Sequence, residues 1–502
     1  MFKKVMIANR GEIALRVMRA CKDLGVSTTL VYSDADRDSL PVKLADEIYP
    51  LGSGLPVATY LNIEKILEAA KATRSDAIHP GYGFLSENHD FARACKKNGI
   101  VFIGPSAEVI QFLGDKVRAR TTATKAGVHT TPGSKGVLKN ADEGKKVAKD
   151  VGYPVVLKAV AGGGGRGMRV VNAPEDMDKL FQNASSEAQA AFGNGSLFLE
   201  KYILKPRHIE VQILGDGKGN VIHLFERECS IQRRHQKLLE ESPSPALDPK
   251  TRARLTAAAL RIARAVDYSS AGTLEFLYDD EDKHFYFMEA NTRVQVEHPV
   301  TEFVTGVDIV REQIRIAAGA KLSILQKDVE QKGCAIECRI TAEDPERGFA
   351  PTPGLIRQAV VPAGPGIRVD TAIYSGYEIP SIYDSLIAKV IAYGADRTEA
   401  IARMKRALSE FVVAGVKTLI PFHLALLDNE KFVKGEFTTR FLDTELKGLL
   451  ARTEEEDLAG ALIAAMHEMS RRVKGGVLQR QEMTGANVWT IAGRMDITRG
   501  KT

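Results

Sequence analysis

The chain contains little cysteine, a single tryptophan and no long apolar run. Its five cysteines are odd in number and scattered over 502 residues, which argues against a disulfide framework and predicts a reducing compartment. Cys334 and Cys338 lie four residues apart, but no other cysteine or histidine cluster completes a zinc site. No segment approaches the roughly 18 apolar residues that a membrane span needs, and the run Met1–Ala8 is typical of a strand rather than of a signal peptide. We therefore expect a cytoplasmic protein without a membrane segment.

A strong excess of charge of one sign is also absent. The net charge is +5, and the composition, 44% hydrophobic and 26% charged, is ordinary for a globular enzyme. Nucleic-acid-binding proteins usually concentrate their positive charge, so we expect no nucleic-acid partner. The length predicts about three domains.

Two common phosphate-binding patterns are missing as well. The first 110 residues alternate short apolar runs with helical patterns, which predicts a doubly wound, Rossmann-like α/β unit. Its first turn reads Ala8-Asn-Arg-Gly-Glu12 instead of Gly-x-Gly-x-x-Gly, which excludes the dinucleotide-binding form of this unit. The Walker pattern Gly-x-x-x-x-Gly-Lys-Ser/Thr is absent from the whole chain. A phosphate site must therefore be of another type.

The pattern of apolar runs divides the chain into three lobes and a tail. We predict an N-terminal Rossmann-like domain over 1–113, a central domain over 114–332 and a C-terminal α+β domain over 333–446. The tail, 447–502, contains a helical pattern over Thr453–Arg472 and the only tryptophan, Trp489. This tail is compatible with packing on the C-terminal lobe and with docking of a partner subunit.

A glycine run, Gly162-Gly-Gly-Gly-Arg-Gly-Met-Arg169, lies between two apolar strands, Val155–Val160 and Met168–Val171. Glycine runs are most often flexible linkers, but the flanking strands indicate a hairpin loop here. Such a loop can close over phosphates because no Cβ keeps its amides away. Lys158, just before the loop, can reach a phosphate or can be a solvated strand-end lysine.

A second hairpin is predicted where Thr273–Tyr278 and His284–Glu289 flank a polar turn. Folding about that turn brings Glu275 and Glu289 near each other, within about one residue of register. Paired carboxylates repel, so among apolar neighbours they need a cation, and magnesium held jointly with nucleotide phosphates fits. The alternative is two separately solvated glutamates on an exposed face.

We expect the strand to continue through Asn291–Glu297, so that Arg293, Gln295 and Glu297 share one face. That face would offer a guanidinium for an oxyanion, an amide, and a carboxylate that can accept a proton. A surface strand of ion pairs is the alternative.

The densest polar cluster is the run Glu226–Lys237. A nucleic-acid patch is one interpretation. The run lacks interleaved aromatics and has acids at both ends, so a cleft for a small anion fits better.

In this order and spacing, the motifs resemble the biotin carboxylases of the ATP-grasp superfamily over residues 2 to 445. The resemblance rests on the glycine run and on five further segments: Ile7-Ala-Asn-Arg-Gly-Glu-Ile-Ala14, Tyr32-Ser-Asp-Ala-Asp36, His79-Pro-Gly-Tyr-Gly-Phe-Leu-Ser-Glu-Asn88, Gln232-Arg-Arg-His-Gln-Lys237 and Met288 to Glu302. It implies an ATP-grasp central lobe with a mobile lid over about 131–201. It also implies carboxylation of biotin with ATP and bicarbonate.

The resemblance implies a nucleotide and metal site. Phosphate contacts are implied for Lys116, Lys158, His208 and the loop residues Gly163, Gly164 and Gly165. Contacts to adenine and the nucleotide pocket are implied for Glu200, Lys201, Ile203, Gln232, His235 and Gln236. Two Mg²⁺ or Mn²⁺ ions would be held by Glu275, Glu289 and Asn291.

Catalytic roles follow from the same resemblance. Bicarbonate would bind Lys237, Arg293, Gln295 and Val296, with Glu297 as general base. Arg339 would stabilise the biotin enolate, and Tyr82 would contact biotin. Ala290 stands where the family usually has methionine, and Leu419 where asparagine or threonine is common; neither touches the implied chemistry.

The family's biotin-attachment tetrapeptide, Ala-Met-Lys-Met, is absent. Ala402-Arg-Met-Lys405 is close to it, but this run lies in a helical pattern without the β-rich surround. The implied partners are therefore a separate biotin carboxyl carrier protein and a carboxyltransferase subunit, with a homodimer suggested by the family. The final acceptor, acetyl-CoA, another acyl-CoA or pyruvate, stays open.

Two other hypotheses remain. The first is another ATP-grasp carboxylate–amine ligase, against which the set Lys237, Arg293, Glu297 and Arg339 argues. The second is an ATP-binding scaffold without activity. The presence of every expected polar residue argues against this second hypothesis.

Overall fold

The computed structural model describes residues 1–160 and 167–451. The glycine-loop residues Gly163, Gly164 and Gly165 and the predicted tail helix therefore lie outside the described residues. The chain up to Leu450 forms one compact unit. Within the described part, no helix combines the length and the apolar character that crossing a bilayer requires. All five cysteines are buried and free of disulfides, as expected.

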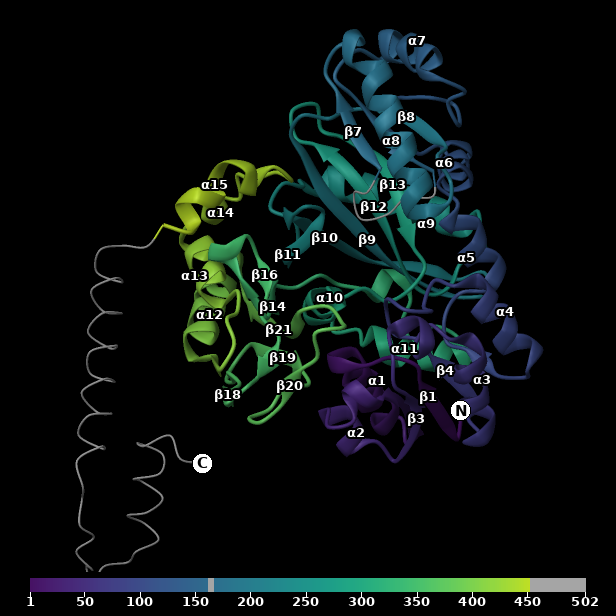
Figure 1. Ribbon diagram of the computed structural model, residues 1–502, viewed down its shortest axis with the longest axis vertical. Coiled ribbons are helices and arrows are strands. Elements are labelled where there is room, and N and C mark those ends of the chain that lie inside the picture. Colours follow the sequence, from purple (N-terminus) through teal and green to yellow (C-terminus); the bar gives the residue numbers. More distant parts are fainter. Residues whose placement is uncertain (161–166, 452–502) are drawn as a thin grey trace, which may run out of the picture. The chain divides into compact units, whose positions relative to one another are not determined.

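The N-terminal lobe is the predicted doubly wound unit. Its five parallel strands have the order β3-β2-β1-β4-β5, and the lobe is the purple to dark blue part of the ribbon in Figure 1. They are β1 (Lys4–Ile7), β2 (Ser27–Ser33), β3 (Glu47–Gly52), β4 (Ala77–His79) and β5 (Val101–Phe102). The helices are α1 (Gly11–Asp23), α2 (Leu40–Leu44), α3 (Ile63–Ala72), α4 (His89–Lys97) and α5 (Ala107–Gly114).

Both faces of this sheet are covered, which explains the continuous apolar run in β1. Val5 and Ile7 belong to one hydrophobic cluster, whereas Met6 and Ala8 belong to another. Alternate residues of a strand point to opposite faces, so a strand between two helical layers must be apolar throughout. The first cluster extends to Val294 and Val307 and so joins this lobe to the central one.

An antiparallel sheet of eight strands forms the centre of the molecule, in the order β13-β12-β9-β10-β11-β14-β21-β19. The strands are β9 (Pro206–Asp216), β10 (Val221–Arg233), β11 (Gln236–Ser242), β12 (Ser269–Asp279), β13 (His284–Asn291), β14 (Cys334–Thr341), β19 (Ile367–Thr371) and β21 (Leu386–Gly394). The sheet runs through the predicted boundary near 332, so the central and C-terminal lobes share it. The domain limits themselves stay predictions.

Helices pack around this sheet. The central lobe has α6 (Lys116–Lys125), α9 (Pro249–Arg264), α10 (His298–Thr305) and α11 (Ile309–Ala317). The C-terminal lobe has α12 (Arg397–Glu410), α13 (Ile420–Asp428), α14 (Glu430–Lys434) and α15 (Phe441–Leu449). Its short two-stranded pairs are β15 (Glu343–Asp344) with β16 (Ala350–Pro351), β17 (Gly354–Leu355) with β20 (Glu378–Ile379), and β18 (Gln358–Val360) with β22 (Val412–Ala414).

The region predicted to be a lid is a small sheet with two helices. Its strands β6 (Val155–Ala159), β7 (Met168–Val171) and β8 (Leu197–Lys201) pair in the order β7-β6-β8. The helices α7 (Ala141–Val151) and α8 (Met177–Phe192) pack on this sheet (Figure 1). The antiparallel pairing of β6 with β7 confirms the hairpin that was predicted around the glycine run.

The carboxylate hairpin is confirmed, but the strand that should follow it is not. β12 pairs with β13, and Glu275 lies directly opposite Glu289. β13 ends at Asn291, residues 292–295 are irregular, and α10 begins at His298. The prediction of an extended strand through Glu297 is therefore wrong. Val294, Gln295 and Glu297 are all buried, instead of alternating between a buried and an exposed face as a strand would require.

A close backbone approach ties the small sheet to the segment that precedes it. Gly133 forms a bridge with Glu200, and the amide of Ser134 donates to the carbonyl of Leu199 at 2.8 Å. A Cβ at Gly133 would lie 2.1 Å from the Leu199 carbonyl oxygen, whereas one at Gly136 would meet nothing within 4 Å. Only glycine fits the first position.

Gly133→Ala should therefore destabilise the protein by about 1–3 kcal/mol, the usual cost of overpacking. Gly136→Ala in the same segment is the matched control and should be nearly neutral. Denaturant midpoints of the two variants and the parent chain measure this difference. Equal stability of both variants would contradict the close packing at Gly133.

The shared sheet also buries carboxylates side by side. Glu240 in β11 pairs across strands with Glu337 in β14, and both are fully buried. Neither carboxylate oxygen of Glu337 has a hydrogen-bond partner among the described residues. Burial raises the pKa of Glu337 well above its usual value; Lys389 and Arg339 oppose this, and Glu240 adds to it.

Because the folded-state pKa of Glu337 lies above its unfolded value of about 4.3, this residue weakens the fold as pH rises. The loss begins near pH 4.3 and continues through the folded-state pKa, at up to about 1.4 kcal/mol per pH unit. Glu337→Gln should remove this contribution, so the variant should lose less stability than the parent between pH 5 and 8. Glu68→Gln, on an exposed face of α3, is the control. Parallel pH profiles of the thermal midpoint for Glu337→Gln and the parent would disprove the assignment.

Candidate active site

The predicted site residues lie around one large cavity between the lobes. The cavity has a volume of about 1410 Å³. Its lining includes every predicted site residue that the structure describes: Tyr82, Lys116, Lys158, Glu200, Lys201, Ile203, His208, Gln232, His235, Gln236, Lys237, Glu275, Glu289, Asn291, Arg293, Gln295, Val296, Glu297 and Arg339. Residues from eight strands, from α6 and from segments outside regular structure thus line the same cavity.

Lys237 holds the centre of the charge cluster. Its ammonium lies 2.6 Å from Glu210 Oε2, 3.2 Å from Glu275 Oε1 and 2.5 Å from Glu297 Oε1. Burial would lower the pKa of Lys237, but the carboxylates of Glu210, Glu275 and Glu297 outweigh burial and raise this pKa well above its usual value. The lysine is therefore charged and shared by three acids.

A tight turn places Lys237 at this point. Arg234 and His235 both have positive φ, +49° and +65°, and connect β10 to β11 between the paired residues Arg233 and Gln236. Two consecutive left-handed residues match the right-handed twist of a hairpin. The turn also puts His235 and Gln236 at the cavity wall.

Glu297 lies between two cations. Arg339 Nη2 is 2.9 Å from Glu297 Oε2, and Arg339 Nε donates to Glu240 Oε1 at 2.7 Å. Burial alone would raise the pKa of Glu297, but Lys237, Arg339 and Arg227 outweigh burial and hold this pKa well below its usual range. The carboxylate is thus ionised at neutral pH and can accept a proton.

The paired glutamates form the second charged group. Asn291 Nδ2 donates to Glu275 Oε1 at 2.8 Å, and His208 Nε2 lies 3.0 Å from Glu275 Oε2. Burial and the facing Glu275 raise the pKa of Glu289, while Lys116, with its ammonium 3.8 Å from Glu289, lowers it. A divalent cation beside the two carboxylates would offset their mutual repulsion. These oxygen donors fit magnesium.

The predicted nucleotide contacts on β6 and β8 pair with each other. Lys158 Nζ lies 2.5 Å from Glu200 Oε2, and Arg120 of α6 also contacts Glu200. Burial would raise the pKa of Glu200, but Lys158 and Arg120 lower it overall. The ammonium of Lys201 donates to the carbonyls of Gly152 and Tyr153, at 2.9 and 3.0 Å.

Arg293 and Tyr82 also line the cavity. Arg293 Nε donates to Glu87 Oε2 at 2.9 Å, and Arg293 Nη2 donates to Asn291 Oδ1 at 3.0 Å. The Tyr82 hydroxyl donates to Glu12. Burial and Glu12 together raise the pKa of Tyr82 well above its usual value, so its hydroxyl stays protonated.

The sequence prediction missed Arg227, which is fully buried on β10. Its guanidinium donates to five side chains, at distances between 2.6 and 3.1 Å: Glu210, Gln212, Thr273, Gln295 and Thr301. Because Arg227 occupies the Gln295 oxygen, the Gln295 amide nitrogen is left to donate to Glu275, at 2.9 Å. Arg227 thus orients Gln295.

Glu210 was missed too, although the sequence carries a signal for it. His208, Glu210 and Gln212 alternate with Ile209, Val211 and Ile213 along β9. Such alternation of polar and apolar residues indicates a polar face on a strand. All three polar side chains are buried.

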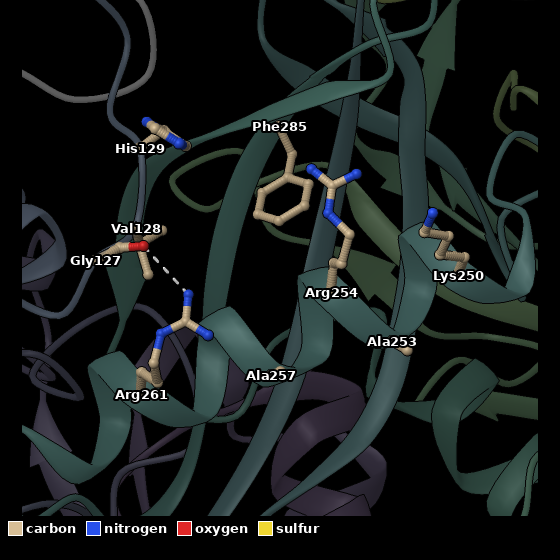
Figure 2. Close-up of a pocket in the computed structure, with 9 residues that line it drawn as sticks. All are labelled: Gly127, Val128, His129, Lys250, Ala253, Arg254, Ala257, Arg261 and Phe285. Atoms are coloured by element: carbon tan, nitrogen blue, oxygen red, sulfur yellow. Dashed lines mark hydrogen bonds between the residues drawn. The ribbon is translucent and has the colours of Figure 1, made fainter.

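A second, smaller cavity of about 500 Å³ lies along α9 (Figure 2). Arg261 donates there to the carbonyl of Gly127 at 3.2 Å, and the Arg254 guanidinium lies 5.5 Å from the centre of the Phe285 ring. The described lining has no carboxylate: Gly127, Val128, His129, Lys250, Ala253, Arg254, Ala257, Arg261 and Phe285. It therefore lacks the donors for a metal-bound nucleotide, which the large cavity has.

Three known domain families match consecutive parts of the chain. The biotin carboxylase N-terminal domain matches residues 1–110, the carbamoyl-phosphate synthase L chain ATP-binding domain matches 115–325, and the biotin carboxylase C-terminal domain matches 337–444. Together these matches cover most of the chain.

Whole proteins are similar as well. Biotin carboxylase 1 of Bacillus subtilis (strain 168) is 55% identical over 444 residues, 88% of this chain and 99% of that protein. The biotin carboxylase of Pseudomonas aeruginosa is 52% identical over 447 residues, 89% of this chain and 99% of that protein.

Among solved structures, the biotin carboxylase domain dimer of Hydrogenobacter thermophilus 2-oxoglutarate carboxylase, in complex with MgADP, ADP and bicarbonate, has a TM-score of 0.87 and 52% identity. The match covers 90% of this chain and 100% of that one. The domain matches and these relatives agree, and the chain belongs to the biotin carboxylase family.

Proposed function

We propose that this chain carboxylates biotin with bicarbonate while it cleaves ATP to ADP and phosphate. The observation that carries this proposal is the ionised Glu297 between Lys237 and Arg339, in the same cavity as the paired glutamates. A base for bicarbonate and a magnesium-binding pair are what the reaction needs together.

The nucleotide would lie between the small sheet and the central sheet. Lys116, Lys158 and His208 would contact the phosphates, with the glycine loop at Gly163, Gly164 and Gly165. Glu200, Lys201, Ile203, Gln232, His235 and Gln236 would surround the base and ribose. Magnesium or manganese, as two ions held by Glu275, Glu289 and Asn291, would offset the charge on the phosphates.

Bicarbonate would bind Lys237, Arg293, Gln295 and the backbone of Val296. Glu297 takes the bicarbonate proton, and the bicarbonate oxygen attacks the γ-phosphorus as ADP leaves. The carboxyphosphate formed breaks down to carbon dioxide and phosphate. The phosphate then takes the proton from biotin N1, and N1 attacks carbon dioxide while Arg339 offsets the negative charge on the ureido oxygen.

The depressed pKa of Glu297 has a consequence for the order of events. A carboxylate held by two cations binds a proton weakly. A bicarbonate anion that contacts Lys237 competes for this lysine, so the pKa of Glu297 rises as the substrate binds. The base becomes effective only when its substrate is present.

The partners are inferred from the family to which the chain belongs. Biotin would arrive on a separate biotin carboxyl carrier protein and would lie against Tyr82 and Arg339. A carboxyltransferase subunit would take the carboxyl group onward and would set the final acceptor. The dimeric relative supports a homodimer, and we place the reaction in the cytoplasm.

Glu297→Gln should abolish bicarbonate-dependent ADP formation, with a loss of about 100-fold or more, because the proton acceptor is removed. In the parent chain, free biotin should stimulate ADP formation. A coupled assay for ADP measures both effects. Glu281→Gln, in the exposed β12–β13 turn, is the matched control and should keep full activity.

Two results would refute the assignment. One is that ADP formation by the parent chain does not depend on bicarbonate or biotin, and the other is full bicarbonate-dependent turnover by Glu297→Gln. The first would favour another ATP-grasp ligase with a different acceptor. No turnover with any substrate would favour a scaffold.

Glu289→Gln should raise the magnesium concentration that gives half-maximal ADP formation by about tenfold or more, because one anionic ligand of a hard cation is lost. The magnesium titration is compared with that of Glu281→Gln. An unchanged magnesium requirement would place the metal away from Glu289.

A further inference from the structure

Lys389 places an ammonium group at the junction of the three lobes. It lies on β21, between its cross-strand neighbours Arg339 on β14 and Asp370 on β19. Its side chain is fully buried, with no exposed area. A buried charge is expensive unless its partners compensate it, so the contacts of Lys389 have to account for its presence.

The ammonium of Lys389 contacts all three lobes. It donates to the carbonyl of Val296 at 2.8 Å and lies 3.2 Å from Glu12 Oε1 of α1 and 3.8 Å from Asp370 Oδ2. Burial opposes the charge, but Glu12, Glu337 and Asp370 raise the pKa of Lys389 overall. Lys389 is therefore a charged donor.

The bond to Val296 acts on the segment that carries the base. The Val296 carbonyl belongs to the peptide plane that it shares with the amide of Glu297. This peptide lies outside the sheet, because β13 ends at Asn291, so no strand pairing fixes it. The hydrogen bond from Lys389 holds it, while Lys237 and Arg339 hold the carboxylate of Glu297.

The ion pair with Glu12 acts on a residue of the N-terminal lobe that also lines the cavity. The same oxygen of Glu12 that faces Lys389 also accepts the hydroxyl of Tyr82. One ammonium thus connects Tyr82, through Glu12, with the backbone of Val296 and Glu297.

We propose that Lys389 is a positioning residue that fixes the Val296–Glu297 peptide relative to Tyr82 and Glu12. This inference rests on the proposed function, in which Glu297 is the base and Tyr82 lies beside biotin. Its effect is to hold the bicarbonate side and the biotin side of the cavity at a constant separation. Displacement of a reacting group by about 1 Å can cost about 100-fold in rate.

A purely structural role is the competing explanation. Lys389 would then serve only as counter-ion for Glu12, Asp370 and Glu337, and its removal would harm folding alone. The two roles predict different activities for a variant in which both Lys389 and its partner Glu12 are replaced by uncharged residues.

The test compares four variants: Lys389→Met, Glu12→Gln, their combination, and Arg397→Met. Arg397 is the matched control, because it also pairs with a buried carboxylate, Glu241 on β11 at 2.6 Å. Lys389 contacts Glu12 and Val296, which line the large cavity, whereas the residues to which Arg397 donates, Glu241, Phe432 and Val433, do not line it. Thermal midpoints are measured together with kcat and with KM for ATP, bicarbonate and free biotin.

Lys389→Met should lower kcat for bicarbonate-dependent ADP formation by about 100-fold, with KM for ATP unchanged within about twofold. The double variant should regain thermal stability without regaining kcat. Glu12→Gln should mainly raise KM for biotin. Arg397→Met should lose stability and keep its kcat.

Recovery of kcat together with stability in the double variant would overturn the proposal, as would a kcat for folded Lys389→Met within about twofold of the parent. If Lys389→Met does not fold, the kcat and thermal midpoint of the double variant alone test the proposal. If the proposed function itself is wrong, ADP formation by the parent chain will not depend on bicarbonate. That result is distinct from a failure of the inference about Lys389.

Discussion

The structure depends most on one buried cation with three acidic neighbours. Lys237 lies within 3.2 Å of Glu210, Glu275 and Glu297, which come from two strands and an irregular segment. Removing one member of such a cluster would leave a buried charge uncompensated, which typically costs about 3–5 kcal/mol. The backbone around the cavity must therefore bring β9, β11, β12 and residues 292–297 together, and Arg227 and Arg339 complete the charge balance from β10 and β14.

The same constraint explains why the chain leaves the sheet after Asn291. A continued strand would send Gln295 and Glu297 along β12, whereas the cavity needs them at Arg227, Lys237 and Arg339. The irregular segment is held by side chains from other elements: Val294 packs in the N-terminal core, and Lys389 binds the Val296 carbonyl. The central and C-terminal lobes thus both contribute to the charge cluster around Lys237. Glu297, the proposed base, lies between Lys237 of the central lobe and Arg339 of the C-terminal lobe.

Local patterns predicted much of this arrangement. The doubly wound lobe follows from alternating strands and helices, and the Glu275–Glu289 pair follows from the position of the β12–β13 turn, because both depend on neighbours in sequence. The strand through Glu297 was predicted wrongly, because periodicity cannot show that Arg227, about 70 residues earlier, draws Gln295 inward. Arg227 and Lys389 were missed for the same reason: each acts through contacts between distant segments. Residues 161–166 of the glycine loop and the tail beyond residue 451 lie outside the described residues, so what was predicted for them stays a prediction.

The central claim is that bicarbonate, activated by Glu297, attacks the γ-phosphate of ATP in this cavity. Bicarbonate labelled with oxygen-18 tests it most directly, with free biotin as acceptor and mass spectrometry of the released phosphate. An attack by bicarbonate leaves one of its oxygens on phosphorus, so each phosphate should carry one labelled atom. Unlabelled phosphate, formed at the same rate in unlabelled water, would show that water attacks instead and would contradict the account.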